Sequence, residues 1–447
     1  MILEEPDLSL ADAQTPNPQG GWLATALFVM VVCYFWIGIA PMPDPQAGSP
    51  AAYGESSNQF NQLIVIAMTA LVLALLVFHP GRILALKVYA PLLVLFAWIA
   101  VTILFSATPD SALRRTLYSV LVCICASAIL LLPRDNAQFA KMMGTCLLLA
   151  VGLSYIGVLF FPGRAIHQAS DFAEQALAGD WRGHLGHKNA AAGAMAFAVF
   201  FGLYLIRAGS FWRGMILTVL AGVFLFNSGG KTSAALLPAI LILTWMFERA
   251  GWLRYGLVIG TLALVNFVIL SVTASPAMRD FVSGLGVDAT FTDRSSIWSL
   301  ALSAIEMRPF TGYGFQSFWQ TEALYYGNHS VSTWAVTAAN AHNSYLDQLI
   351  NGGVPLLVLV VGWIVVLPIR HAGMALKRGN DKNTTRLFIR IWMFGLFMSC
   401  FESPFFNNYG PIWFTMLIAV FGLHLQARAV LLEKTVPDAA QLQPALS

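Results

Sequence analysis

The stretch LVIGTLALVNFVILSVT, at residues 257–273, is 17 residues long and contains no charged side chain. Such a run can cross the hydrocarbon core of a bilayer as a helix, which satisfies its own backbone hydrogen bonds. The whole chain has the same character, because 57% of its 447 residues are hydrophobic and 11% are charged, against about 25% charged in soluble domains. The sequence therefore predicts an all-α polytopic membrane protein.

We expect about 12 transmembrane helices. Three expected spans, 215–226, 234–247 and 388–402, are shorter than about 17 residues, so they must extend into their flanks or lie in thinned, protein-lined surroundings. The expected spans are 22–40, 60–78, 88–105, 116–132, 142–161, 189–206, 215–226, 234–247, 257–273, 353–369, 388–402 and 411–427.

Loop charges predict the orientation. If the amino terminus is cytoplasmic, the inner loops hold fifteen Lys and Arg residues and the outer loops nine, which places the long polar loop outside the cytoplasm. The amino-terminal residues contain acidic but no basic side chains, the reverse of an export signal. The expected organisation is a disordered cytoplasmic tail (1–21), transmembrane helices 1–9 with short loops (22–273), a long periplasmic loop with short amphipathic helices and the active site (274–352), transmembrane helices 10–12 (353–427) and a cytoplasmic tail (428–447).

The segment WRGHLGHKN, at residues 181–189, places cationic and hydrogen-bonding side chains directly before an Ala- and Gly-rich helix. Arg182, His187 and Lys188 add to the positive end of the helix dipole there, which favours an anion such as a phosphate or diphosphate. The competing interpretation is structural: Arg182 and Lys188 anchor at the membrane interface, and Asn189 caps the helix.

A second candidate anion site is NSGGKTS, at residues 227–233, between two short apolar segments. Successive glycines let backbone N–H groups converge on an anion, and Lys231 adds a cation near the membrane surface. A glycine turn with a snorkelling lysine would have the same sequence. The chemistry of this turn leaves both interpretations open.

Residues 292–298, TDRSSIW, begin an amphipathic stretch within the long loop. Thr292 or Asp293 can cap this helix, which leaves Arg294 in the first turn, where a cation is unfavourable unless it faces an anion. This position indicates that Arg294 contacts a ligand. An Asp293–Arg294 surface pair is the structural alternative.

The loop approaches its end at ANAHNSYLD, residues 339–347. A histidine at a membrane edge titrates near neutral pH and can accept a proton from a sugar hydroxyl, which makes His342 a candidate general base. Asn343 lies beside it, and Asp347 could orient the imidazole. The alternative is a structural histidine. Aromatic side chains of the loop, such as Trp298, could stack on sugars, although packing at the membrane surface is the more common role of such residues.

Nucleotides and metals are not indicated. The chain has no Gly-rich phosphate-binding motif and no large cytoplasmic domain, so any donor is expected to arrive already activated on a lipid. The five cysteines all lie in apolar stretches without zinc-ligand spacing. We expect no cofactor, no metal and no nucleic-acid partner.

Together these motifs resemble the O-antigen ligase and Wzy-type polymerase superfamily, from about residue 90 to residue 425. The His-Lys-Asn element is most similar to the ExoQ-like exopolysaccharide polymerase branch. The resemblance rests on Trp181-x-Gly183 with Gly186-His187-Lys188-Asn189, the Ser-Gly turn at 228–233, Asp293-Arg294 with Trp298, Pro309-x-x-Gly312-x-Gly314, and His342-Asn343-x-x-Leu346 before Gly352-Gly353.

The resemblance implies a metal-independent, inverting glycosyl transfer at the periplasmic face of the bacterial inner membrane, with undecaprenyl diphosphate as leaving group. The family's loop histidine, which serves catalysis, corresponds to His342, and its diphosphate-binding arginine corresponds to Arg294. The Ser-rich turn usually supplies a second arginine, whereas this chain has Lys231, which lacks the bidentate fork. Either the geometry of diphosphate binding differs here, or Arg182 and Lys188 contribute to diphosphate binding. Supporting roles are expected for His187, Asn189, Asp293, Asn343 and Asp347.

The leading hypothesis is a polymerase that joins lipid-linked repeats into an exopolysaccharide or O-antigen. Its expected partners are an undecaprenyl-diphosphate-linked oligosaccharide donor, a glycan or lipid A core acceptor, membrane lipids and a chain-length regulator. A ligase that moves finished glycan to lipid A core would use nearly the same residues, and the sequence does not separate the two. A flippase or transporter has a similar number of spans, but here the charges cluster at one face and no two-half repeat is evident.

Overall fold

The computed structural model describes residues 21–43, 59–77, 86–171, 175–284, 294–327 and 333–432. Within these ranges the chain is helical and contains one isolated β-bridge, between Ile166 and Trp181. The α-helices are α1 (Gly21–Ile37), α3 (Gln59–Val77), α5 (Ala90–Ile103), α6 (Pro109–Ala128), α7 (Asn136–Phe160), α8 (Pro162–Ala165), α9 (Lys188–Arg207), α10 (Phe211–Asn227), α11 (Lys231–Arg249), α12 (Thr261–Ala274), α13 (Pro276–Gly284), α14 (Arg294–Met307), α15 (Glu322–Tyr325), α16 (Ser344–Val361), α17 (Leu367–Ala375), α18 (Lys382–Met398) and α19 (Pro411–Gln426).

Each of the twelve expected spans coincides with a helix in the described part of the chain. Within the described ranges, seven helical segments are long and apolar enough to cross a membrane, and α1, α5, α10 and α19 are shorter apolar helices. The three expected spans that were too short are extended by their flanks, as in α11, which reaches 19 residues. The prediction of an all-α polytopic membrane protein is confirmed.

Helix α9 lies in the core, and its small residues explain how. Its Ala- and Gly-rich face lets neighbouring backbones approach closely, a common basis of helix packing in membranes. A Cβ atom on Gly202 would lie 2.9 Å from the Gly214 carbonyl oxygen of α10. Most residues of α9, α18 and α19 are buried. This packing fixes the start of α9 beside the turn that follows α18.

A glycine pair lies where the long loop is expected to end, at residue 352. A helical segment already begins at Ser344, and Gly352 and Gly353, whose backbone is non-helical, form a kink that separates this segment from the rest of α16. Gly353 has a φ of 68°, and a Cβ atom there would lie 2.4 Å from the backbone of Phe310. The Val354 amide also donates to the Pro309 carbonyl at 2.8 Å. The kink therefore receives the Pro309 turn.

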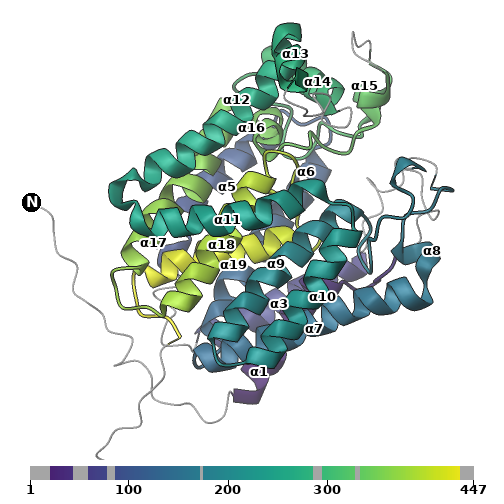
Figure 1. Cartoon of the computed structure of the whole chain (residues 1–447). Coiled ribbons are helices and arrows are strands. Elements are labelled where there is room, and N and C mark those ends of the chain that lie inside the picture. The colour runs from purple at the N-terminus through teal and green to yellow at the C-terminus, as the bar shows by residue number, and fades with distance from the viewer. Residues whose placement is uncertain are drawn as a thin grey trace, which may run out of the picture.

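Short helices of the loop gather at one end of the bundle. Figure 1 shows α13, α14 and α15 together beyond the end of α12, at the upper right of the view, with α8 on the same side. The expected short amphipathic helices in this loop correspond to α13 and α14. Both expected tails lie mainly outside the described residues, which begin at 21 and end at 432.

Candidate active site

A single carboxylate, that of Glu402, joins three segments at this end of the bundle. It lies in the turn after α18 and pairs with Arg294 of α14, whose Nη2 is 2.6 Å from Oε1. The Nδ1 atom of His342, just before α16, is 3.1 Å from the other oxygen, Oε2. Asn189, in the first turn of α9, donates to Oε1 at 2.8 Å. The two residues predicted to carry the chemistry, His342 and Arg294, thus share one neighbour.

The Glu402 carboxyl is ionised in this environment. Burial favours the neutral acid, but the hydrogen bond from His342 and the charge of Arg294 outweigh burial and lower the pKa of Glu402 to about 2. Because this pKa lies below the ordinary value of 4.5, ionised Glu402 stabilises the fold above pH 4.5, and this contribution is lost as the pH falls toward 2.

The ionised state of Glu402 determines the tautomer of His342. A carboxylate can only accept hydrogen bonds, so Nδ1 of His342 must carry the hydrogen that lies between them. In the neutral imidazole, Nε2 is then the atom with a free lone pair. A neutral His342 would therefore present Nε2 as its basic atom, as a general base requires.

The backbone around His342 is held in an uncommon conformation. His342 has a φ of 47°, in the left-handed region that non-glycine residues rarely adopt. The carbonyl of the preceding Ala341 accepts from Trp298 Nε1 at 2.9 Å, and its amide donates to Asp347 at 3.0 Å. Asp347 also accepts from Trp319 at 2.8 Å. The surroundings thus impose a strained geometry on this position, as is common at functional sites.

Two of the expected supporting residues have structural tasks here. The Asn343 side chain caps α16 by accepting from two backbone amides, and its Nδ2 donates to Asn266 of α12 at 3.0 Å. Asp347 holds the backbone before His342, whereas the carboxylate that touches the imidazole is Glu402. The expected part of Asp347 in orienting the ring stays a prediction.

In the segment before α9, the cationic side chains are paired with carboxylates of the same segment. Arg182 is 3% exposed, pairs with Asp171 at 3.0 Å and donates to the carbonyls of two residues of α8 and of Ile166, which follows it. Lys188 pairs with Asp180 at 2.6 Å. Both cations expected at a diphosphate are held by carboxylates of their own segment.

The residue that caps α9 is not the one that the structural interpretation predicts. The His187 side chain accepts from the Asn189 amide and occupies the capping position. Asn189, which the structural interpretation made the cap, instead directs its side-chain amide to Glu402. Asn189 therefore connects this segment to the Glu402 cluster, which we define as Arg294, His342, Asn189 and Glu402.

Lys231 begins α11 from a tightly packed glycine turn. Gly229 has a φ of 62°, and a Cβ atom there would lie 2.4 Å from the Asp180 carboxylate. A Cβ atom on Gly230 would lie 2.3 Å from that of Ala192 in α9. The Lys231 side chain is exposed and has no ion pair among the described residues. Because Ala192 lies one helical turn after Asn189, the turn with Lys231 packs against the same end of α9.

Glu402 was not among the residues predicted from the sequence. The sequence feature that could have identified it is an acidic residue at the end of an apolar segment, in Glu402-Ser403-Pro404. An ionisable residue in such a position is by default a candidate functional residue. Asp293 lies outside the described residues. The described ranges contain no group of three or more His, Cys, Asp or Glu side chains arranged to hold a metal ion.

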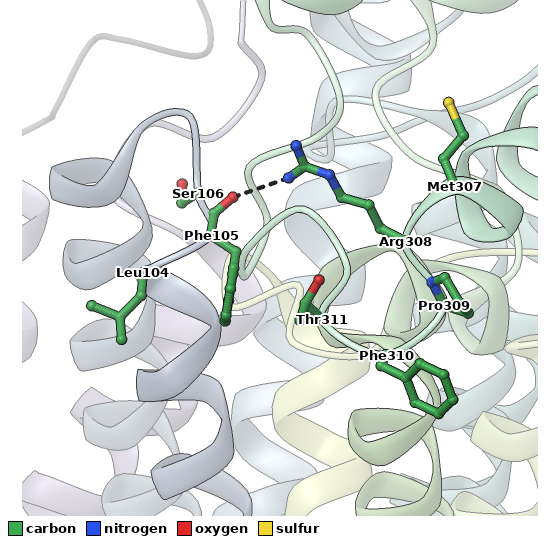
Figure 2. Close-up of a pocket in the computed structure, with 8 residues that line it drawn as sticks. All are labelled: Leu104, Phe105, Ser106, Met307, Arg308, Pro309, Phe310 and Thr311. Carbon is green, nitrogen blue, oxygen red and sulfur yellow. Dashed lines mark hydrogen bonds between the residues drawn. The ribbon is translucent and has the colours of Figure 1, made fainter.

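A separate cavity of about 560 Å³ lies between the ends of α5 and α14. Figure 2 shows Arg308 reaching across it toward the Phe105 carbonyl, with which it makes a hydrogen bond of 3.5 Å. Its rim includes the exposed side chains of Leu104 and Phe310. Because α14 has 14 residues, this cavity is about 20 Å from Arg294 at the other end of the helix. We assign it no part in the chemistry at Glu402.

The fold and the cluster define a multi-pass helical membrane protein with a polar site at one end of its bundle. A family model described as O-Antigen ligase matches residues 214–361, which confirms the resemblance to the O-antigen ligase and Wzy-type polymerase superfamily. The matched segment contains Lys231, Arg294 and His342, and it supports a membrane glycan ligase or polymerase. The ExoQ-like branch stays a prediction. No match was found among the curated proteins.

Proposed function

We propose that this protein transfers an oligosaccharide from undecaprenyl diphosphate to a hydroxyl group of an acceptor glycan, at the periplasmic face of the bacterial inner membrane. The meeting of His342 and Arg294 at Glu402 is the observation that carries the proposal. The sequence assigned the two residues different tasks, a base and a diphosphate ligand. One reaction centre requires both tasks side by side.

Each group has a defined task in this reaction. The lipid diphosphate is already a good leaving group, so the protein must supply cations for its developing charge, a base for the acceptor and alignment of the two substrates. The planar guanidinium of Arg294 binds the diphosphate, and Lys231 adds a second cation. His342 accepts the proton of the attacking hydroxyl, which approaches opposite the leaving group and inverts the anomeric centre.

Arg182 and Lys188 act through the shape of the site. Their carboxylate partners, Asp171 and Asp180, hold them in the segment before α9. A direct contact with diphosphate would require these pairs to open. We therefore propose that the pairs fix the start of α9, where Asn189 reaches Glu402.

Polymerisation of exopolysaccharide or O-antigen repeats is the form of the reaction we favour, since the His-Lys-Asn element resembles the ExoQ-like branch. Ligation to lipid A core is the second candidate, because the matched family model is described as O-Antigen ligase. Transport is less well supported. The candidate residues gather at helix ends, whereas transporters bind substrates near the midplane.

Turnover of a natural donor tests the proposal. The donor would be lipid-linked oligosaccharide extracted from a strain that lacks the gene, and the protein would be purified in detergent or nanodiscs. We expect release of undecaprenyl diphosphate with growth of the acceptor glycan, and loss of both with His342→Ala. Intact donor after incubation with the folded wild-type protein would refute the proposal.

The glycan of the deletion strain separates the two forms of the reaction. Loss of a polymerase leaves a single lipid-linked repeat, because no further repeats are joined. Loss of a ligase leaves long lipid-linked chains, because finished glycan is not removed from the carrier. We expect the single repeat.

A further inference from the structure

Glu402 lies between two groups on which the proposed reaction places different demands. Arg294 must be available to a diphosphate, and His342 must keep a fixed ring orientation and tautomer. In the structure Glu402 satisfies both residues at once, with one oxygen for each. Its backbone carbonyl also accepts from the Ser344 amide at 3.1 Å, so the turn that carries Glu402 is tied to the start of α16.

We propose that Glu402 is a positioning residue that holds Arg294 as a temporary counter-ion, releases it to the donor's diphosphate, and keeps His342 oriented throughout. This inference rests on the proposed function. It adds a residue outside the segment matched by the family model, which ends at 361, and a defined sequence of contacts during binding.

The exchange at Arg294 follows from charge and geometry. The guanidinium is at the start of α14, where the helix dipole disfavours a cation, so an anion must compensate it. Glu402 contacts it through one Nη2–Oε1 pair, and Nη1 donates to the Phe401 carbonyl. Two of the five N–H groups are engaged in these bonds, which leaves donors for a second anion. A diphosphate carries more charge than a carboxylate and can bind in a bidentate manner.

The orientation of His342 concerns the proton. As the acceptor oxygen bonds to the anomeric carbon, its proton passes to Nε2 of His342. The bond from that carbon to the diphosphate oxygen breaks, and the electron pair leaves with the diphosphate. The resulting imidazolium keeps Nδ1–H on Glu402, whose negative charge stabilises it. Asp347 is the other carboxylate near this imidazole, through its bond to the Ala341 amide.

A purely structural ion pair is the competing interpretation, and the chain provides a matched example. Arg386 of α18 and Glu248 of α11 form two hydrogen bonds, one of them 2.6 Å long. Glu248 is 17 residues from Lys231 along α11, or about 25 Å. Glu248→Gln therefore removes a carboxylate–arginine pair without touching the Glu402 cluster.

The test separates turnover from binding in Glu402→Gln. Turnover is the rate of undecaprenyl diphosphate release from the lipid-linked donor, and the binding probe is undecaprenyl diphosphate itself. We expect turnover to fall about 100-fold or more, because the base loses its orienting charge. Binding of the probe should stay equal or become tighter, because Arg294 is freed and a negative charge is removed. Glu248→Gln should change neither quantity.

The opposite pattern overturns the inference. Weaker probe binding in proportion to the lost turnover would mean that Glu402 merely maintains the site, and wild-type turnover would mean that it has no role in orienting His342. Should Glu402→Gln not fold, as judged by thermal unfolding, Glu402→Asp carries the same test. We expect about tenfold lower turnover and unchanged binding, and wild-type turnover or a parallel loss of both would again refute it. Failure of the proposed function differs from these outcomes, because the wild-type protein would then be inactive.

Discussion

Two clusters in this protein combine an arginine, a carboxylate and a histidine, yet their surroundings differ. In the segment before α9, Asp171 pairs with Arg182 at 3.0 Å and with His167 at 3.5 Å. At the other site, Glu402 pairs with Arg294 at 2.6 Å and with His342 at 3.1 Å. The side chains of His167 and Arg182 are 0% and 4% exposed, whereas those of His342 and Arg294 are 29% and 17% exposed.

The difference shows that two clusters of the same composition can differ in exposure and in the hydrogen bonds that their side chains make. Arg182 directs its remaining donors to loop carbonyls, so its cluster fastens a loop. Arg294 has N–H donors beyond the two that bind Phe401 and Glu402, and the backbone of His342 has a positive φ. We call the Glu402 cluster the open cluster, because its side chains can exchange partners. We call Asp171, Arg182 and His167 the sealed cluster, because it would first have to unfold locally.

Replacement of each histidine by alanine gives the largest expected contrast. His342→Ala should lower glycan transfer by about 100-fold to 10,000-fold, the usual range for loss of a general base, with little change in thermal unfolding. His167→Ala should chiefly lower the unfolding temperature. The measurements are donor turnover and thermal unfolding of both purified variants. An unaltered glycan chain-length distribution with His342→Ala at normal protein levels would remove the catalytic assignment.

Replacement of each arginine tests the same contrast through stability. Arg182→Ala removes the arginine from the Asp171 carboxylate, whose side chain is only 9% exposed, which should lower the free energy of unfolding by about 3 kcal/mol. Arg294→Ala should leave stability closer to wild type and weaken binding of undecaprenyl diphosphate. Denaturation curves and binding measurements on both variants decide the matter. If Arg182→Ala binds the probe poorly while unfolding like wild type, the sealed cluster contacts the ligand after all.

The sequence predicts the helices well because hydrophobicity alone determines them. A run such as 257–273 has no other way to bury its backbone in lipid. The break before the tenth expected span could also be read from the sequence. Gly352 and Gly353 signal it, and the backbone is non-helical at both residues, where the Pro309 turn packs into the kink.

His342 and Arg294 could be identified from their local motifs, whereas Glu402 could not. It is 60 residues from His342 and 108 from Arg294 along the chain, so only the packing of α18 against its neighbours brings them together. For the same reason the carboxylate partners of Arg182 and Lys188, and the lack of one for Lys231 among the described residues, could not be predicted. Arg182 pairs with Asp171 and Lys188 pairs with Asp180, and both carboxylates lie outside the segment 181–189.

Lys231 sharpens the comparison because it is exposed and has no ion pair among the described residues, whereas Lys188 is paired with Asp180. Lys231→Ala should lower donor affinity about tenfold, since an exposed cation beside the diphosphate is lost, and Lys231→Arg should retain or improve it. Lys188→Ala should have a smaller effect on affinity, because its charge is already paired with Asp180. Titration with undecaprenyl diphosphate measures all three. Equal losses for the two alanine variants would contradict the division.

The smallest expected effect is a dependence of stability on pH that comes from His184, in the segment before α9. His184 is buried between Ser154 and Trp36, with its Nε2 donating to the Trp36 carbonyl at 2.7 Å and Nδ1 accepting from Ser154 at 2.6 Å. Burial lowers the pKa of His184, partly offset by the Trp36 hydrogen bond. As the pH falls below about 6.5, the unfolded chain therefore binds a proton that the folded chain resists, and stability decreases.

Thermal unfolding between pH 7 and pH 5 measures this effect. The wild-type protein should lose about 1–2 kcal/mol more than His184→Gln over this interval, because one titrating group contributes at most about 1.4 kcal/mol per pH unit. Glu402 does not contribute here, since its stabilising effect declines only below pH 4.5. Parallel curves for the two proteins would show that another group sets the acid sensitivity. If wild type and His184→Gln differ in stability but share the same pH dependence of turnover, the segment before α9 and the open cluster respond to pH independently of each other.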